Sequence, residues 1–271
     1  MRAEAPRVPS LLRPVHRFLR AVGRTSSLVA EHAGQIGTLV AQTLVALVTL
    51  KVSVRSVLNQ VYIMGVQSLP IVLVTAVLAG IVTSQQGGYQ FQGSVPLYIL
   101  GSVVVASVVL ELGPVLTAIV LVGRVGARIT AELGTMKVSE QIDAFHALGR
   151  DPVAILGAPR IVAGVIIMPV LVAIANLVGI VAGMVAAWHT VGLGYQSFLY
   201  GAQLFWHNWD LLYSMMKAVT FGVAIPIIAV HMGLRTSGGA AGVGRTTTAS
   251  VMFMTLTILI LDALFPPLFL Q

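Results

Sequence analysis

The chain has 271 residues, of which 57% are hydrophobic and only 9% are charged, whereas an average soluble domain carries roughly 25% charged residues. So few charges cannot cover a soluble globule of this size, which excludes a soluble enzyme, a disordered chain and a nucleic-acid-binding domain. The mean hydropathy of +0.93 instead predicts an all-α, polytopic membrane protein with a single membrane domain over residues 1–271. The net charge of +7 comes from basic residues placed between apolar runs, and the chain has no cysteine to form disulfides.

Residues 1–60 are predicted to form amphipathic helices on the cytoplasmic surface of the membrane. In Leu11–Arg24, apolar residues share one helical face and arginines share the other, as in helices that lie on anionic headgroups. Leu28–Leu50 is the ambiguous stretch, because Glu31 and His32 weaken it as a span. A crossing there would also place six arginines on the opposite side from the basic residues that follow it. We favour an interfacial helix, with a sixth span as the alternative.

Five segments are long and apolar enough to be transmembrane helices, which need about 20 mostly apolar residues. Two of them contain no Asp, Glu, Lys or Arg, and the other three contain one such charged residue each. The predicted spans are Val61–Thr83, Val95–Val122, Ile161–Trp188, Leu211–Leu234 and Thr247–Leu270.

Basic residues indicate which side is cytoplasmic. Of the 16 Lys and Arg residues, 15 lie before the first span, between the second and third, or between the fourth and fifth. Because cytoplasmic loops carry the excess of Lys and Arg, the N-terminus is predicted to be cytoplasmic. Five spans then place the C-terminus on the opposite, periplasmic side.

The longest polar connection, residues 123–158, is predicted to be cytoplasmic and to contain a short amphipathic helix. Ser139 is the predicted N-cap, Glu140 falls in the first turn, and Gly149 ends the helix. Three apolar residues recur there at helical spacing, which indicates packing on the spans or docking into a partner's groove. These residues are Ile142, Phe145 and Leu148.

A second helix is predicted before this one. Arg128 and Glu132 are four residues apart, so they can pair on one helical face. Gly134 is predicted to end that helix.

One long stretch resembles a known family. Glu111–Pro152, which reads ELGPVLTAIVLVGRVGARITAELGTMKVSEQIDAFHALGRDP, is similar to the signature of the MlaE/YrbE permeases. The resemblance extends from about Met64 to the C-terminus and includes Gln85, Gln86 and Gly87 and the Leu261–Asp262 pair. One departure is Leu110, where several relatives carry Arg, so a local Arg–Glu pair is not expected.

The resemblance implies a function and a set of partners. Such permeases are membrane subunits of ABC transporters that move phospholipid, or a similar hydrophobic lipid, between the bacterial inner membrane and the cell envelope. The partners implied are a second copy of the chain, a cytoplasmic ATPase subunit that binds ATP and magnesium, and a periplasmic MCE-domain protein. The residues implied to dock onto the ATPase are Glu140, Gln141, Ile142, Asp143, Phe145 and Leu148, and those implied to line the lipid cavity are Thr83, Gln86, Gln90 and Phe91. A solvated turn is the alternative for the second group.

The three charged residues inside the spans need a partner or water, because a charge at membrane depth costs at least ~2.5 kcal/mol. Glu111 is interpreted either as a hydrogen-bonding group that holds helices together or as a group that lines the lipid cavity. Pro114 is predicted to kink the helix beside it. Lys217 is predicted to reach the outer surface. Pairing of Lys217 with Asp262 is the alternative.

No catalytic residue, metal site or cofactor site is predicted in this chain. Gly239–Thr246, which reads GAAGVGRT, resembles a phosphate-binding loop, but it joins two spans and is interpreted as a flexible turn. The alternative functions are a self-sufficient channel or secondary transporter and an intramembrane lipid enzyme. Both would need clustered ionisable residues, and those of this chain are far apart in sequence.

Overall fold

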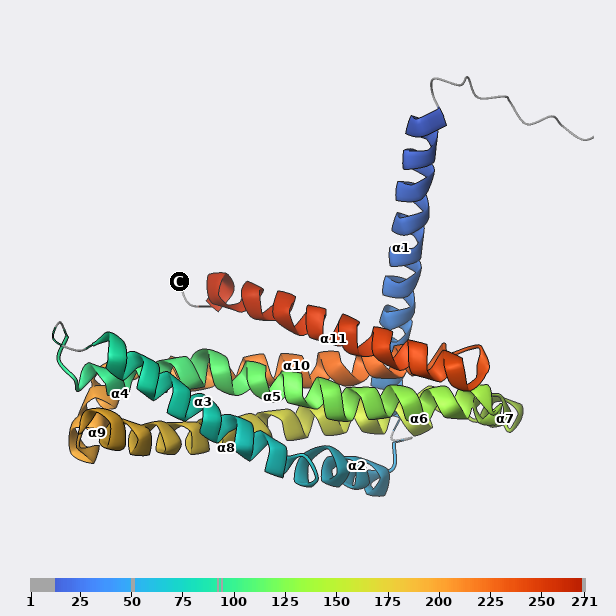
Figure 1. The fold of residues 1–271 in the computed structure, drawn as a ribbon. Coiled ribbons are helices and arrows are strands. Elements are labelled where there is room, and N and C mark those ends of the chain that lie inside the picture. Colours follow the sequence, from blue (N-terminus) through green and yellow to red (C-terminus); the bar gives the residue numbers. More distant parts are fainter. Residues whose placement is uncertain (1–12, 50–51, 92, 94, 270–271) are drawn as a thin grey trace, which may run out of the picture.

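The computed structural model describes residues 13–49, 52–91, 93 and 95–269, with side chains from Ala30 onward. Over these residues the chain is helical and has no strand, which confirms the all-α class. Five helical rods are long and apolar enough to cross a membrane, as predicted. In Figure 1 these rods run in roughly the same direction and form a bundle.

Each predicted span falls on one rod. The first rod, Val54–Gln90, joins α2 (Val54–Val61), a π-helical turn (Tyr62–Val66) and α3 (Leu69–Gln90). The second, Ile99–Val138, joins α4 (Ile99–Ser107), α5 (Gly113–Leu121) and α6 (Ala127–Val138) through π-helical turns at Val108–Leu112 and Val122–Gly126. The third consists of a π-helical turn (Val153–Gly157) and α8 (Ala158–Val191), and the last two are α10 (Asn208–Leu234) and α11 (Gly239–Phe269).

A short helix lies at each end of the bundle. α9 (Tyr195–Leu204) lies at the end where α3 connects to α4, and α7 (Gln141–Ala147) lies at the other end, beyond α6 (Figure 1). Apart from Lys217 and the arginines of α1, the described Lys and Arg residues lie toward the α7 end, which we call the basic end. These residues are Arg55, Arg124, Arg128, Lys137, Arg150, Arg160, Arg235 and Arg245.

The second rod is much longer than its predicted span. Its 40 residues correspond to about 60 Å at 1.5 Å per residue, roughly twice the hydrocarbon thickness of a bilayer. α6 therefore continues past the apolar run toward α7. Gly134 lies inside α6 and does not end it, contrary to the prediction. A Cβ atom at this position would collide with Thr236, which follows α10. The glycine serves close packing between the two segments.

α1 (Arg13–Val48) runs across the direction of the five rods (Figure 1). Leu39, Thr43 and Ala46 are buried, and α1 contacts α8, α10 and the Val153–Gly157 turn near the basic end. α1 is not one of the five described helices that are long and apolar enough to cross a membrane. The interfacial placement of Leu28–Leu50 stays a prediction. The amphipathic face predicted for Leu11–Arg24 lies outside the described side chains.

Hydrogen bonds attach α1 to the end of α10. His32 Nδ1 and His231 Nε2 are 2.9 Å apart. Arg235 donates to Gln35 and pairs with Glu31 at 3.3 Å. α1 is therefore held by side chains as well as by apolar packing.

Close packing joins α8 to both α3 and α4. A Cβ atom on Gly80 would collide with the Gly179 carbonyl, and one on Gly183 would meet Val104 at 2.7 Å. Small residues let helices approach in this way inside membranes. Gly179 and Gly183 thus serve close helix packing, whereas Gly123 has open space around it.

Candidate functional site

Three ionisable side chains from three different rods meet inside the bundle. The Lys217 ammonium on α10 lies 2.6 Å from Glu111 Oε2 and 2.5 Å from Asp262 Oδ1. Glu111 belongs to the Val108–Leu112 turn of the second rod, and Asp262 belongs to α11. We call these three residues the ionic cluster. It links the second, fourth and fifth rods.

The backbone of the second rod supplies one more oxygen to Lys217. In a regular helix the carbonyl of Leu110 would accept a hydrogen bond from the N–H of residue 114, but that residue is Pro114, which has none. Lys217 Nζ donates to the Leu110 carbonyl at 3.2 Å instead. The proline thus leaves this carbonyl without its usual α-helical donor at the point where the ammonium lies. The Val108–Leu112 turn is π-helical, and such turns are frequent at functional sites.

The three side chains of the ionic cluster differ in exposure. The Lys217 side chain is fully buried, Asp262 is 15% exposed and Glu111 is 47% exposed. Lys217 does not reach the outer surface, contrary to the prediction, because two carboxylates and a carbonyl surround it inside the bundle. Asp262 pairs with it, which was the alternative.

The charges of the ionic cluster do not balance when all three groups are ionised, since two carboxylates face one ammonium. The contact with Lys217 gives Glu111 the helix-holding role that the sequence suggested. Because the Glu111 side chain is half-exposed, its carboxylate can also contact a molecule that packs against this face of the chain. The cavity-lining role of Glu111 stays a prediction.

A second polar contact beside the ionic cluster was missed by sequence reasoning. Asn176 on α8 donates to Ser214 on α10 at 3.0 Å, and both side chains are buried. The Asn176 amide oxygen lies against Gly113, where a Cβ atom would collide with it. An Asn in the middle of an apolar span was the available signal, because a buried amide needs a partner.

The predicted docking segment is folded as a short helix at the basic end. Ile142 is buried, Phe145 is half-buried, and Leu148 is 75% exposed. Glu140, Gln141 and Asp143 are exposed, and Asp143 pairs with Lys137 at 2.8 Å. Ile142 therefore attaches α7 to its own chain, while Leu148 remains open to a partner.

The ends of α7 differ partly from the prediction. The N-cap is Glu140, with a left-handed φ of 61°, whereas the Ser139 hydroxyl donates to the Thr135 carbonyl at 2.8 Å. Ser139 was thus the wrong cap by one residue. At the other end, Gly149 has a φ of +67° and two backbone hydrogen bonds close the helix, as predicted for a C-terminal glycine.

The predicted Arg128–Glu132 pair is not formed. Glu132 pairs instead with Arg160 at 2.9 Å, and the Arg160 side chain is 96% buried. Arg128 donates to Gln67 at 3.5 Å. Glu132 pairs with Arg160 rather than with Arg128 because an unpaired buried guanidinium costs more free energy than an unpaired exposed one.

The four residues predicted to line a lipid cavity lie at the end of the first rod. Gln86 and Gln90 are exposed, and Thr83 is partly exposed with its hydroxyl donated to the Ala79 carbonyl at 2.8 Å. Phe91 packs against the apolar group that contains Phe198. Within one chain the polar members face outward and do not converge on an enclosed site.

The described residues hold no group of three His, Asp or Glu side chains that could bind a metal ion. Gly239–Thr246 forms the first turns of α11, so the predicted flexible turn is wrong. The segment does not follow a strand, which a phosphate-binding loop requires.

Comparisons with known proteins agree on one family. Residues 57–267 match the family of the permease MlaE. A probable ABC transporter permease protein of Synechocystis is 38% identical over 210 residues, covering 78% of this chain and 80% of the relative. One from Rickettsia prowazekii is 36% identical over 213 residues (79% and 82%). One from Porphyra purpurea is 35% identical over 204 residues (75% and 78%).

Proposed function

The chain belongs to the MlaE permease family, and we propose that it moves phospholipid, or a similar hydrophobic lipid, between the inner membrane and the cell envelope. Family and relatives support a permease subunit of an ABC transporter, and the chain is a multi-pass membrane protein. A permease of this kind works with a separate ATPase subunit. The lipid cargo, the MCE-domain protein and the pairing of two copies are parts of the proposal.

The observation that carries the proposal is the position of α7. It lies at the basic end, beyond the 40-residue second rod, and Leu148 projects from it with 75% of its surface exposed. An exposed leucine at the end of a short helix is suited to a groove on a partner protein. We assign that groove to the ATPase subunit, with Glu140, Gln141, Asp143 and Phe145 around the leucine.

The orientation follows from the same end of the bundle. The basic residues of the rods and their connections lie toward α7, and cytoplasmic segments carry the excess of Lys and Arg. In the proposed arrangement the N-terminus and α7 are cytoplasmic. The α3–α4 connection, α9 and the C-terminus then face the periplasm, where an MCE-domain protein would bind.

A second copy would complete the lipid path. Glu111 is half-exposed at membrane depth, where a carboxylate bordered by lipid alone is costly. A pair of chains enclosing a partly wet cavity would shelter this carboxylate and bring the exposed Gln86 and Gln90 to the cavity wall. ATP-driven movement of α7 would then change the shape of that cavity.

The test is a pull-down of the tagged full-length chain from its native membrane in mild detergent, with mass spectrometry of proteins and lipids. Leu148→Asp should reduce recovery of the ATPase at least about tenfold, because it places a charge in an apolar contact. Leu148 is a cleaner site than Phe145, which is partly packed on the chain itself. The matched control is Leu204→Asp, on α9 at the opposite end, where Leu204 is 49% exposed.

Each outcome decides part of the proposal. Co-purification of an ATPase with the wild type and Leu204→Asp, but not Leu148→Asp, supports the docking assignment. Equal recovery with both variants contradicts it. Recovery of the chain without any ATPase, in several detergents, would favour a self-sufficient carrier. Such a carrier needs clustered ionisable residues, and the ionic cluster contains three.

A further inference from the structure

The ionic cluster carries one negative charge more than the chain itself neutralises. Two carboxylates, Glu111 and Asp262, face the single ammonium of Lys217. Among the described residues, Lys217 is the one hydrogen-bond donor to the Glu111 carboxylate, and it uses Oε2. The other oxygen, Oε1, receives no hydrogen bond from the described part of the chain, and the side chain is half-exposed. One carboxylate oxygen is therefore available to a group from another molecule.

A second polar group in the ionic cluster also lacks a partner. Tyr213 lies one turn before Lys217 on α10 and is fully buried, and the Lys217 ammonium is 5.4 Å from the centre of its ring. The Tyr213 hydroxyl has no hydrogen-bond partner among the described residues. Buried polar groups are nearly always hydrogen-bonded, to the protein, to water or to a ligand. The described chain thus balances neither the charge nor the hydrogen bonds of this region.

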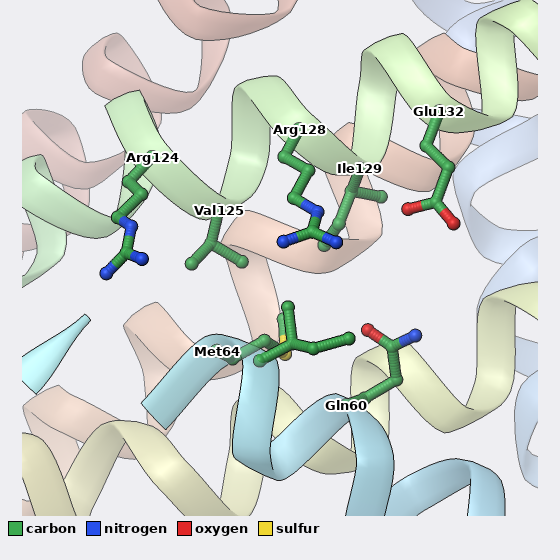
Figure 2. A pocket seen from close by; sticks show the side chains of 8 residues that line it. Gln60, Met64, Arg124, Val125, Arg128, Ile129 and Glu132 are labelled. Atoms are coloured by element: carbon green, nitrogen blue, oxygen red, sulfur yellow. The ribbon is translucent and has the colours of Figure 1, made fainter. Parts of the chain in front are cut away.

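The described arginines of the second rod are too far from Glu111 to balance its charge. Arg124 is the first of them, and it lies about 20 Å from Glu111 along the rod at 1.5 Å per residue. Figure 2 shows that Arg124 and Arg128 point toward the first rod at the basic end. A second copy of the chain brings no new cation to this depth. Lys217 is the one Lys or Arg inside the five predicted spans, and it is buried within its own ionic cluster.

The depth of the ionic cluster limits which cation can reach it. Trp209 comes eight residues before Lys217 on α10, and its indole donates to the Phe269 carbonyl at 2.9 Å. Tryptophan is enriched at membrane–water interfaces, so the ionic cluster lies about 12 Å inside the interface at the α9 end, at 1.5 Å per residue. A free ion is disfavoured at that depth. A lipid inside a transport cavity can bring its headgroup there while its acyl chains stay in apolar surroundings.

α11 leaves one side of the ionic cluster uncovered. It contacts α5, the Val122–Gly126 turn and α6 of the second rod. Toward its C-terminal end, which contains Asp262, it diverges from the other rods (Figure 1). Glu111 precedes α5 on the second rod, so it lies on this diverging side, where half of its side chain stays exposed. A headgroup can approach the carboxylate from there.

We propose that Glu111 binds the primary ammonium of the lipid that the transporter moves, so that the cargo is a phospholipid with an ethanolamine-type headgroup. A primary ammonium carries three N–H donors and no acceptor. It supplies the positive charge that the ionic cluster lacks and a charge-assisted hydrogen bond to Glu111 Oε1. An anionic headgroup would add to the excess negative charge, and a quaternary ammonium would bring no N–H donor. The inference rests on the proposed function, because it names the class of lipid that enters the cavity.

Two other occupants would balance the charge differently. A proton on one of the carboxyl groups would neutralise the ionic cluster without a ligand, and the headgroup of the cargo would then make no difference. A free water-soluble amine would supply the same ammonium without an acyl chain. Both are outcomes of the test.

The experiment is lipid binding to the full-length chain, purified in neutral detergent with the subunits that accompany it and measured by native mass spectrometry. The probes are phosphatidylethanolamine, phosphatidylcholine and phosphatidylglycerol with identical acyl chains, and free ethanolamine is the competitor. We expect at least about tenfold more phosphatidylethanolamine adducts than adducts of either other lipid, because hydrogen bonds to charged groups are the strong ones. These adducts should survive millimolar ethanolamine.

Glu111→Gln removes the half-exposed carboxylate and leaves one carboxylate facing one ammonium. It should lower phosphatidylethanolamine occupancy to that of the other two lipids. The matched control is Asp151→Asn, which removes an exposed carboxylate at the basic end and keeps the acceptor for the Val153 N–H. This control should keep the preference. If Glu111→Gln does not fold, the comparison of the three lipids on the wild type still decides the proposal.

The outcomes separate this inference from the proposed function. A preference for phosphatidylethanolamine in the wild type and in Asp151→Asn, but not in Glu111→Gln, supports the assignment. Equal binding of all three lipids, as expected for a protonated carboxyl group, would overturn it and leave lipid transport standing. Equal binding of the ethanolamine and choline lipids, displacement by free ethanolamine, or a preference retained in Glu111→Gln would also overturn it. Absence of any bound lipid would contradict the proposed function itself.

Discussion

Replacing Lys217 by Met tests whether the ionic cluster holds the bundle together. The change removes an ammonium that lies 2.6 Å from Glu111 and 2.5 Å from Asp262, and it leaves two carboxylates facing each other. Removing one member of a buried ion pair costs about 3–5 kcal/mol. Glu111 is 47% exposed and contributes little to that cost, so we take the lower end, about 3 kcal/mol, chiefly from Asp262. For a domain of this size, the midpoint of thermal unfolding should fall by about 6–12 °C.

The assay is thermal unfolding of the detergent-solubilised chain, with two matched variants. Lys137→Met removes a surface lysine, paired with Asp143 at 2.8 Å, and should lower the midpoint by no more than about 4 °C. Adding Glu111→Gln and Asp262→Asn to Lys217→Met removes the unpaired charges and should restore at least half of the loss. A Lys217→Met midpoint within 2 °C of wild type would refute the reasoning, and so would a triple variant no better than the single one.

Three further changes test the packing around the site. Gly80→Ala should destabilise the chain by about 3 kcal/mol in the same assay, because the new methyl would meet the α8 backbone, whereas Gly123→Ala, in open space, should be neutral; equal effects would contradict the close approach. His32→Ala should speed proteolytic removal of α1 about fivefold by deleting its hydrogen bond to α10, and an unchanged cleavage rate would argue against that attachment. Glu132→Gln should lower stability by about 1–3 kcal/mol, more than Arg160→Met, because it leaves the buried guanidinium without a carboxylate, whereas the methionine removes the buried charge and leaves only a half-exposed carboxylate; the reverse order would contradict the burial argument.

Hydropathy and charge predicted the number of spans because the bilayer imposes a length and excludes charge from each one. These two signals describe each segment separately. They carry no information on how a helix is rotated about its own axis or on which neighbour it meets. The pairing of Lys217 with Glu111, across 106 residues of sequence, follows from that rotation and could not be predicted from composition.

Local sequence signals were reliable where backbone conformation alone determines the structure, and less reliable where side-chain packing determines it. Gly149 ends α7 because a left-handed residue is needed there, and that requirement is visible in the sequence. Gly134 gives the same signal but lies inside α6. A glycine is suited to this position for another reason, since a side chain there would collide with Thr236. Glu132 had a suitable partner four residues away, and the buried Arg160 competes for it successfully.

The second rod connects the two parts of the candidate site. Glu111 and the start of α7 lie on either side of an unbroken helical path that ends at Val138, about 40 Å from Glu111 at 1.5 Å per residue. A helix of this length is stiff along most of its course, and its π-helical turns at Val108–Leu112 and Val122–Gly126 are the places where its hydrogen bonding changes. If a partner subunit displaces α7, the movement reaches the Leu110 carbonyl and Glu111 through this rod. Lys217 holds both of those groups, so the ionic cluster is where such a displacement would be opposed by α10 and α11.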